Sequence, residues 1–278
     1  MKNYSINVSG QLITFDSPKV MGIINVTPDS FHKDSRKQNI EDIVATAKKM
    51  LDTGADFLDL GGMSSRPGAK EISAQEEIDR VIPAIESILK KYPTAILSID
   101  TYRSEVAKAA LHAGAKLIND ISGGDADTNI LELAAKNNIP YICMHMQGAP
   151  QNMQDNPSYE NVVIDVFKNL QQKIVRCREA GIKDVIIDVG FGFGKTIEQN
   201  FELLGKMDYF QHLDCPILAG LSRKSMLYKS LELEPDNSLN ATTAAHMIAL
   251  QKGANILRVH DVKEAVESFM IWELSNPK

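Results

Sequence analysis

The sequence is poor in cysteine and in aromatic residues. Only three cysteines occur in 278 residues, Cys143, Cys177 and Cys215, and their positions show no metal-ligand spacing. Cys143 and Cys215 lie in or beside apolar runs, so we expect buried thiols in a reducing cytoplasm. Aromatic residues make up 6% and hydrophobic residues 44% of the chain, which indicates a core of Ile, Leu, Val and Ala.

Long apolar runs and an excess of basic residues are also missing. No segment approaches the roughly 18 apolar residues of a membrane span, and Met1–Asn7 has no signal-peptide stretch. We therefore expect a cytoplasmic protein with no membrane partner. The formal net charge of −6 argues against broad binding to nucleic acid, which rewards basic faces. Any anionic small-molecule substrate must then meet a local cluster of cations.

Eight short apolar runs do occur, each ending in a polar or glycine-rich cluster, with helical patterns between them. This order is typical of a (β/α)8 TIM barrel of about 250 residues, whose active site lies at the C-terminal ends of the strands. We predict a single domain over residues 1–278, with an N-terminal β-hairpin in 1–18 and the barrel in 19–278. The clusters are Ile24–Ser30, Asp59–Gly62, Ser98–Asp100, Ile118–Asp120, Met144–Met146, Ile187–Asp188, Gly220–Lys224 and Leu257–His260.

Local signals predict the elements between these clusters. Ser5–Phe15 alternates around Ser9-Gly10, which predicts a hairpin that plugs the N-terminal end of the barrel. Ser73 and Glu76 form a capping-box pattern ahead of a helix. Other helices are expected around Ile40–Leu51 and over Ser104–Ala113, Tyr159–Ala180 and Ser238–Lys252, with the glycines Gly54, Gly114, Gly181 and Gly253 at their ends.

Two acidic residues at predicted strand ends are the first candidates for the site. Asp100 and Asp188 have no neighbouring cation in the sequence, and a buried carboxylate without a partner is costly. Each should meet a cation or the donors of a ligand, unless it is only a helix cap or a turn residue. Asn119 ends the neighbouring strand, and its amide both donates and accepts.

Arg258 and His260 are spaced two residues apart at the last strand end, so their side chains share one face. Barrels often bind phosphate near strands 7 and 8, and an Arg fork beside an imidazole suits a diphosphate. The alternative is a structural salt bridge from Arg258 to Asp261 or another acid. His145, between Met144 and Met146, is more typical of a core or rim histidine, and we assign it no role.

Four motifs in one order carry a specific resemblance. They resemble the dihydropteroate synthase family, and the similarity spans Val20 to the final helix. Gly190–Lys195 is glycine-rich, but it lacks the spacing of a dinucleotide loop. The motifs are Asn25–Phe31, Gly61–Gly68, Asp188 with Gly190–Lys195, and Ser222–Ser225.

The resemblance implies a reaction that joins p-aminobenzoate to 6-hydroxymethyl-7,8-dihydropterin pyrophosphate and releases pyrophosphate. It implies that acids deep in the barrel hold the pterin, that cations nearer the rim hold the diphosphate, that Mg²⁺ is bound through Asn25, and that the protein is a homodimer. By resemblance the pterin contacts are Asp100, Asn119, Asp188 and Lys224, the diphosphate contacts Ser65, Arg258 and His260, and the p-aminobenzoate contacts Arg66, Pro67, Phe193 and Ser225.

The chain departs from the family pattern at four places. Val189 stands where the family has Pro, Met63 where Glu is common, and Ser65 where Thr is common; the segment Phe31–Ser35 has no glycine. Two rivals remain open. A pterin-dependent methyltransferase shares the barrel and the acidic pocket but needs a corrinoid partner and no diphosphate site. A non-catalytic pterin-binding protein would bind without turnover.

Overall fold

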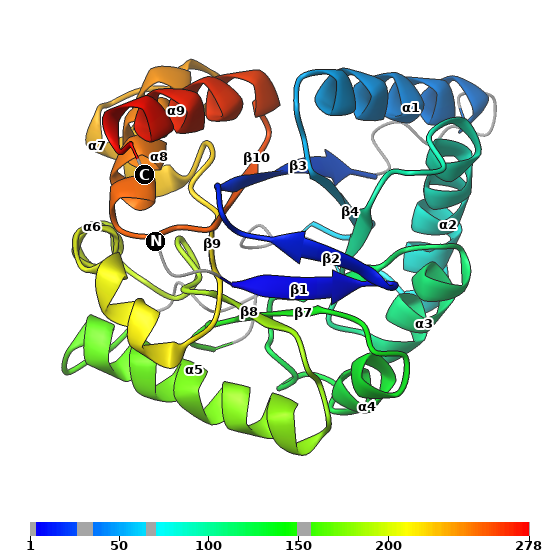
Figure 1. Ribbon diagram of the computed structural model, residues 1–278, viewed down its shortest axis with the longest axis horizontal. Helices are drawn as coiled ribbons and strands as arrows, with labels where there is room; N and C mark the ends of the chain where they lie inside the picture. The colour runs from blue at the N-terminus through cyan, green and yellow to red at the C-terminus, as the bar shows by residue number, and fades with distance from the viewer. Residues whose placement is uncertain (1–3, 27–35, 65–70, 149–156, 278) are drawn as a thin grey trace.

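The computed structural model describes residues 4–26, 36–64, 71–148 and 157–277. Eight parallel strands close into a barrel in chain order, and the last strand pairs with the first (Figure 1). The helices surround this ring, which confirms the predicted TIM barrel. The strands are β3 (Lys19–Asn25), β4 (Phe57–Gly61), β5 (Leu97–Asp100), β6 (Leu117–Asp120), β7 (Tyr141–Met144), β8 (Val185–Asp188), β9 (Ile217–Ala219) and β10 (Ile256–Val259).

The predicted helices are present, with ends within a few residues of the expected ones. Gly54, Gly114, Gly181 and Gly253 follow helices with φ between 91° and 110°, a left-handed conformation that favours glycine. Ser73 accepts a hydrogen bond from the Glu76 N–H at 3.1 Å and so caps its helix. The helices are α1 (Arg36–Asp52), α2 (Ala74–Lys91), α3 (Ser104–His112), α4 (Asn129–Lys136), α5 (Val162–Glu179), α6 (Ile197–Gly205), α7 (Ser225–Ser230), α8 (Leu239–Gln251) and α9 (Val262–Ser275), with the 3-10 turns η2 (Met207–Leu213) and η3 (Pro235–Asn237).

The N-terminal hairpin closes one end of the barrel, as predicted. Strands β1 (Ser5–Val8) and β2 (Gln11–Thr14) pair antiparallel and cross the middle of the ring in Figure 1. Ile6, Val8 and Phe15 are buried against the deepest layer of barrel side chains. This end of the barrel is therefore filled with hydrocarbon, and any polar chemistry must lie at the opposite end.

Seven barrel strands and Ile96, directly before β5, each contribute one side chain to this deepest layer. Because side chains alternate along a strand, residues two and four positions further on also point into the barrel, at successively higher levels. This alternation determines which of the candidate site residues face the inside of the barrel. The deepest layer consists of Met21, Phe57, Ile96, Leu117, Ile142, Ile186, Leu218 and Ile256.

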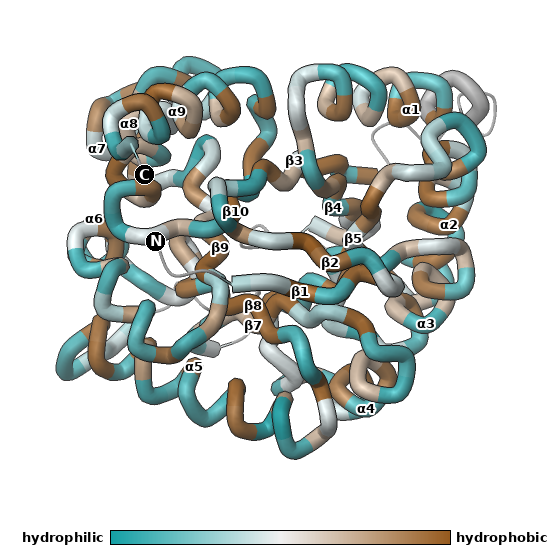
Figure 2. The backbone as a smooth tube through the Cα atoms, viewed as in Figure 1, coloured by the Kyte–Doolittle hydropathy of each residue, from teal (hydrophilic) through white to brown (hydrophobic). Residues whose placement is uncertain are grey.

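The alternate strand residues point outward and form a second core against the helices. Figure 2 shows hydrophobic strands at the centre and helices whose colour alternates between hydrophilic and hydrophobic along their length. Cys143, Cys177 and Cys215 are all free and buried, which confirms the expectation for Cys143 and Cys215. Among the described residues, no helix is both long and apolar enough to cross a membrane.

Candidate active site

Polar side chains fill the barrel directly above the deepest hydrophobic layer. Asp59, Asn119, Asp188 and Arg258 each lie two residues beyond a member of that layer. Asn25, Asp100 and His260 lie four residues beyond, nearer the mouth. The regular two-residue period of the strands thus brings polar groups from six strands into one cavity.

Arg258 joins the acids of this cavity. Its Nε donates to Asp59 Oδ2 at 2.6 Å, and a terminal nitrogen donates to Asp100 Oδ2 at 2.5 Å. The Asn119 amide also donates to Asp59 Oδ2, at 2.8 Å. Asp59 is fully buried, and its other oxygen has no protein partner. Arg258 therefore does not lie apart from the acids, because its guanidinium contacts both Asp59 and Asp100.

Asp261, the other partner considered for Arg258, is occupied elsewhere. Arg223 holds it with two hydrogen bonds of 2.9 Å. This pair ties the loop after β9 to the end of β10, so it fixes the neighbours of Lys224 and His260. Arg258 instead pairs with two acids inside the barrel, Asp100 and Asp59, which lie 158 and 199 residues away in the chain.

The charges in the cavity perturb one another. Burial opposes the charge on Arg258, but Asp59 and Asp100 outweigh it and raise the pKa of Arg258. Burial raises the pKa of Asp100, and Arg258 acts against that rise. Burial likewise raises the pKa of Asp188, opposed by the Gly190 N–H, which donates to Asp188 Oδ1 at 2.8 Å. Burial thus disfavours the charge of both carboxylates, and hydrogen-bond donors from a ligand would stabilise that charge.

Lys224 adds a second cation at the C-terminal end of the barrel. Its Nζ lies 4.2 Å from the centre of the Phe193 ring, a cation–π contact. Burial lowers the pKa of Lys224 to about 8, and Asp188 acts in the opposite direction. The amine therefore remains mostly protonated at neutral pH while keeping little of its hydration.

His260 lies at the rim beside Ser222. The His260 backbone N–H donates to Ser222 Oγ at 3.2 Å, and Nδ1 lies 3.1 Å from the same oxygen. Although the residue is exposed, partial withdrawal of its ring from water lowers the pKa of His260, and the charge of Arg258 lowers it further. Its imidazole is therefore neutral at pH 7 in the absence of an anion.

The remaining candidates divide into described and undescribed residues. Asn25 is exposed at the end of β3, and Ser225 is half-buried at the start of α7. Ser65, Arg66 and Pro67 lie outside the described residues, as does Phe31–Ser35. Within the described ranges, no group of three or more His, Cys, Asp or Glu residues could hold a metal. A metal here would need ligands from its substrate as well as from the protein.

Several functional-site residues were missed by the sequence reasoning. Asp59 stood at a predicted strand end but received no role, although its spacing of two residues from Phe57 marks it as inward-facing. An apolar cluster also lines the C-terminal end of the barrel. Its flat ring and thioether surfaces suit a planar ligand. The cluster consists of Phe193, already expected by resemblance to contact the p-aminobenzoate, with Ile121 and Met144, and Tyr102 and Met146 pack against it.

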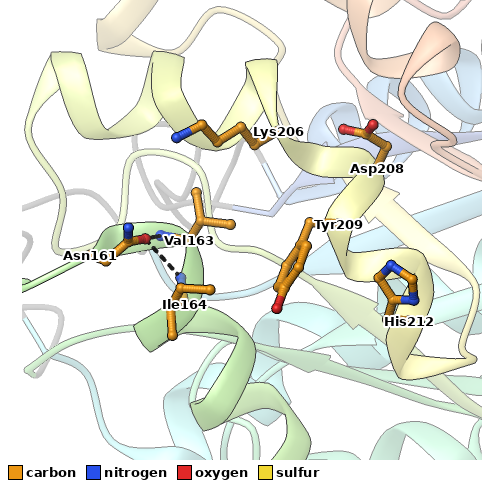
Figure 3. Close-up of a pocket in the computed structure, with 7 residues that line it drawn as sticks. All are labelled: Asn161, Val163, Ile164, Lys206, Asp208, Tyr209 and His212. Atoms are coloured by element: carbon orange, nitrogen blue, oxygen red, sulfur yellow. Dashed lines mark hydrogen bonds between the residues drawn. The ribbon is translucent and has the colours of Figure 1, made fainter.

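A separate groove of about 390 Å³ lies on the outer surface between the start of α5 and η2 (Figure 3). Residues such as Asn161, Lys206 and Tyr209 line it, and no strand residue does. It shares no residue with the barrel cavity, so it has no part in the chemistry of that site.

Comparison with known proteins agrees with this geometry. A family model described as pterin binding enzyme matches residues 21–260. The dihydropteroate synthase of Escherichia coli K12 is 42% identical over 266 residues, covering 95% of this chain and 94% of that protein. The enzyme of Haemophilus influenzae is 42% identical over 275 residues, covering 98% of each chain.

Solved structures are similar over the whole chain. The Xanthomonas albilineans dihydropteroate synthase with 4-aminobenzoic acid has a TM-score of 0.91 and 38% identity, covering 100% of both chains. The Yersinia pestis enzyme in complex with a sulfonamide drug has a TM-score of 0.91 and 42% identity, covering 98% of this chain and 99% of that one. A further Xanthomonas albilineans structure contains 7,8-dihydropteroate, with a TM-score of 0.88 and 36% identity over 99% of this chain and 100% of that one.

Proposed function

Since this chain belongs to the pterin binding enzyme family, we propose that it is a dihydropteroate synthase acting as one domain in the cytoplasm. It condenses 6-hydroxymethyl-7,8-dihydropterin pyrophosphate with p-aminobenzoate to give 7,8-dihydropteroate and pyrophosphate. The observation that carries the proposal is the contact of Arg258 with Asp59 and Asp100. One cavity thereby combines acceptors for a nitrogen-rich ring with a cation for its diphosphate.

The pterin ring is held by the acids and amide inside the barrel. It carries an amino group beside a ring N–H, and a carboxylate accepts such a pair of donors side by side. Asp188 and Asp100 are buried carboxylates suited to this role, and Asn119 adds a group that donates and accepts. Lys224 donates to the oxygen and a ring nitrogen of the pterin.

The diphosphate lies nearer the rim. Arg258 and His260 come from one strand end, and Ser65 adds a hydroxyl from a segment outside the described residues. Asn25 fits a Mg²⁺ ion, because its exposed amide oxygen is a hard ligand and Mg²⁺ takes its other ligands from phosphates and water. When bound, Mg²⁺ would neutralise charge on the departing pyrophosphate.

The p-aminobenzoate lies on the other side of the reacting methylene. Phe193 provides an apolar surface for its ring, and Ser225 at the start of α7 provides a hydroxyl for its carboxylate. Arg66 and Pro67 complete this wall in the proposal. A sulfonamide that resembles p-aminobenzoate would compete for the same surface.

The charge balance of the cavity favours loss of pyrophosphate before attack by the amine. The carboxylates of Asp100 and Asp188 lie where the pterin is proposed to bind, and Arg258, Lys224 and Lys195 offset part of their charge. This arrangement stabilises a cation that develops on the pterin methylene. Arylamine nitrogen is a weak base and attacks without a strong general base, so none of these residues has to remove a proton first.

We propose that the homodimer implied by the resemblance forms through an exposed apolar surface. Helices α7, α8 and α9 lie together in Figure 1, and exposed apolar side chains occur on α8, on α9 and in the segment directly after α7. Exposed apolar patches of this kind mark protein interfaces. We propose that a second copy of the chain covers them. The residues are Leu231, Leu233, Ile248, Met270, Ile271 and Leu274.

The test is the complete reaction. Purified protein with both substrates and Mg²⁺ should form dihydropteroate and pyrophosphate in equal amounts. Pterin binding without pyrophosphate release would instead favour a non-catalytic pterin-binding protein. Methyl transfer to or from a corrinoid protein, with no affinity for pyrophosphate, would favour the methyltransferase.

A further inference from the structure

The ammonium of Lys195 lies at the centre of the glycine-rich loop after β8. The side chain is only 3% exposed, and Lys195 Nζ donates to the Gly190 carbonyl at 2.8 Å and to the Phe193 carbonyl at 2.9 Å. It also lies 3.0 Å from His145 Nδ1. Burial lowers the pKa of Lys195 to about 7, and Asp188 acts in the opposite direction. In its charged form the amine has three protons, which match these three acceptors.

His145 can accept this hydrogen bond because its ring is neutral. Burial lowers the pKa of His145 well below its usual value, and the nearby Lys195 and Lys173 lower it further. A neutral imidazole with Nδ1 as acceptor carries its proton on Nε2. The histidine to which the sequence assigned no role is thus a partner of Lys195.

The loop needs such an anchor because its backbone is unusual. Gly190, Gly192 and Gly194 have φ of 72°, 79° and 59°. A Cβ on Gly190 would overlap the His145 carbonyl oxygen, and a Cβ on Gly194 would lie 2.6 Å from the Gln147 carbonyl oxygen. The loop therefore packs tightly on the end of β7, in a conformation that glycine loses much entropy to adopt.

Two features of the active site depend on this loop. The Gly190 N–H orients the Asp188 carboxylate at 2.8 Å, and the Phe193 ring lies 4.2 Å from Lys224 Nζ. The ammonium holds the carbonyls of the same two residues. A shift of either carbonyl would move a group that faces the pterin or the p-aminobenzoate.

We propose that Lys195 is a positioning residue for the reaction, which fixes the Gly190–Gly194 loop through the Gly190 and Phe193 carbonyls and through His145. The inference rests on the proposed function. It differs from a purely structural role, because loss of the ammonium should alter substrate affinity in molecules that remain folded.

Lys195→Met tests this, since methionine keeps the length of the side chain and removes the charge. In the folded protein we expect the KM for p-aminobenzoate to rise about tenfold or more, as expected for losing hydrogen bonds to a charged group. The affinity for a pterin, measured by calorimetry, should fall less, because the charges of Lys224 and Arg258 still act on Asp188. Leu170→Ala is the matched control: it opens a cavity in α5 and lowers the melting temperature, and it should leave both values unchanged.

A second pair of variants covers the case in which Lys195→Met does not fold. His145→Gln keeps an acceptor for the ammonium and His145→Leu removes it, so the leucine variant should show the larger rise in KM. Unchanged KM and pterin affinity in folded Lys195→Met, or equal effects of the two His145 variants, would overturn the role of Lys195. If the wild-type protein neither binds pterin nor turns over, the proposed function fails instead.

Discussion

Replacing Asp59 by asparagine tests whether this acid holds Arg258 in place. The variant keeps the shape of the side chain and removes the charge that accepts from Arg258 Nε at 2.6 Å. A hydrogen bond between charged groups contributes about 1.5–3 kcal/mol, which is roughly a 10- to 150-fold change in an equilibrium constant. Arg258 retains Asp100 as a partner, so we expect the lower end, about tenfold weaker binding of pyrophosphate.

The assay is a double-mutant cycle with Arg258→Met, in which calorimetry measures the affinity for inorganic pyrophosphate in the presence of Mg²⁺. If Asp59 acts through Arg258, Asp59→Asn should cost about tenfold in the wild-type background and less than about twofold beside Arg258→Met. Asp56→Asn is the control. Asp56 pairs with Lys19 at 3.3 Å at the opposite end of the barrel, and its loss should leave pyrophosphate affinity unchanged.

Equal losses in both backgrounds would refute this reasoning, because Asp59 would then influence pyrophosphate without Arg258. Activity alone would not separate the two cases, since Asp59 also accepts from Asn119 at 2.8 Å. The affinity for pyrophosphate reports on the contact between Asp59 and Arg258. Pterin affinity in the same variants reports separately on Asn119.

Three further outcomes are expected. Asp188→Asn should weaken pterin binding in calorimetry by more than about tenfold with little change in melting temperature, because burial already disfavours this charge; unaltered affinity would remove Asp188 from the site. Since the pKa of His260 is lowered in the free protein and an anion raises it, pyrophosphate binding should take up a proton near pH 6 and strengthen as the pH falls. Calorimetry in buffers of different ionisation enthalpy measures that uptake, which His260→Gln should reduce. Ile271→Glu with Leu274→Glu should convert a dimer to a monomer in sedimentation, whereas Leu12→Glu, equally exposed but on the hairpin, should not.

The barrel could be predicted from the sequence because the signals that begin and end its helices are local. Gly54 and Gly253 end helices through a backbone conformation that glycine favours, and Ser73 caps the next helix with its own hydroxyl. The ends of the strands then located the site, since a barrel places all eight at one face. Asp100 and Asp188 could therefore be predicted as site residues from their positions at strand ends, without knowledge of their partners.

The partners could not be predicted, because they come from strands far apart in the chain. Arg258 meets Asp59 across 199 residues, and no spacing in the sequence records that contact. Lys195 was visible only as the end of a glycine-rich motif. Its hydrogen bonds to His145 and to two carbonyls depend on how the loop folds onto β7, which local patterns do not specify.

The bridging position of Arg258 has a consequence for how the two halves of the substrate bind. Arg258 contacts the Asp100 carboxylate that the proposed function assigns to the pterin. A diphosphate at the rim competes for the same guanidinium and so releases Asp100. Each half of the substrate then favours binding of the other, and such coupling is reciprocal by thermodynamic necessity. The fully buried Asp59, which accepts from Arg258 Nε at 2.6 Å, would keep the arginine attached to the barrel during this exchange.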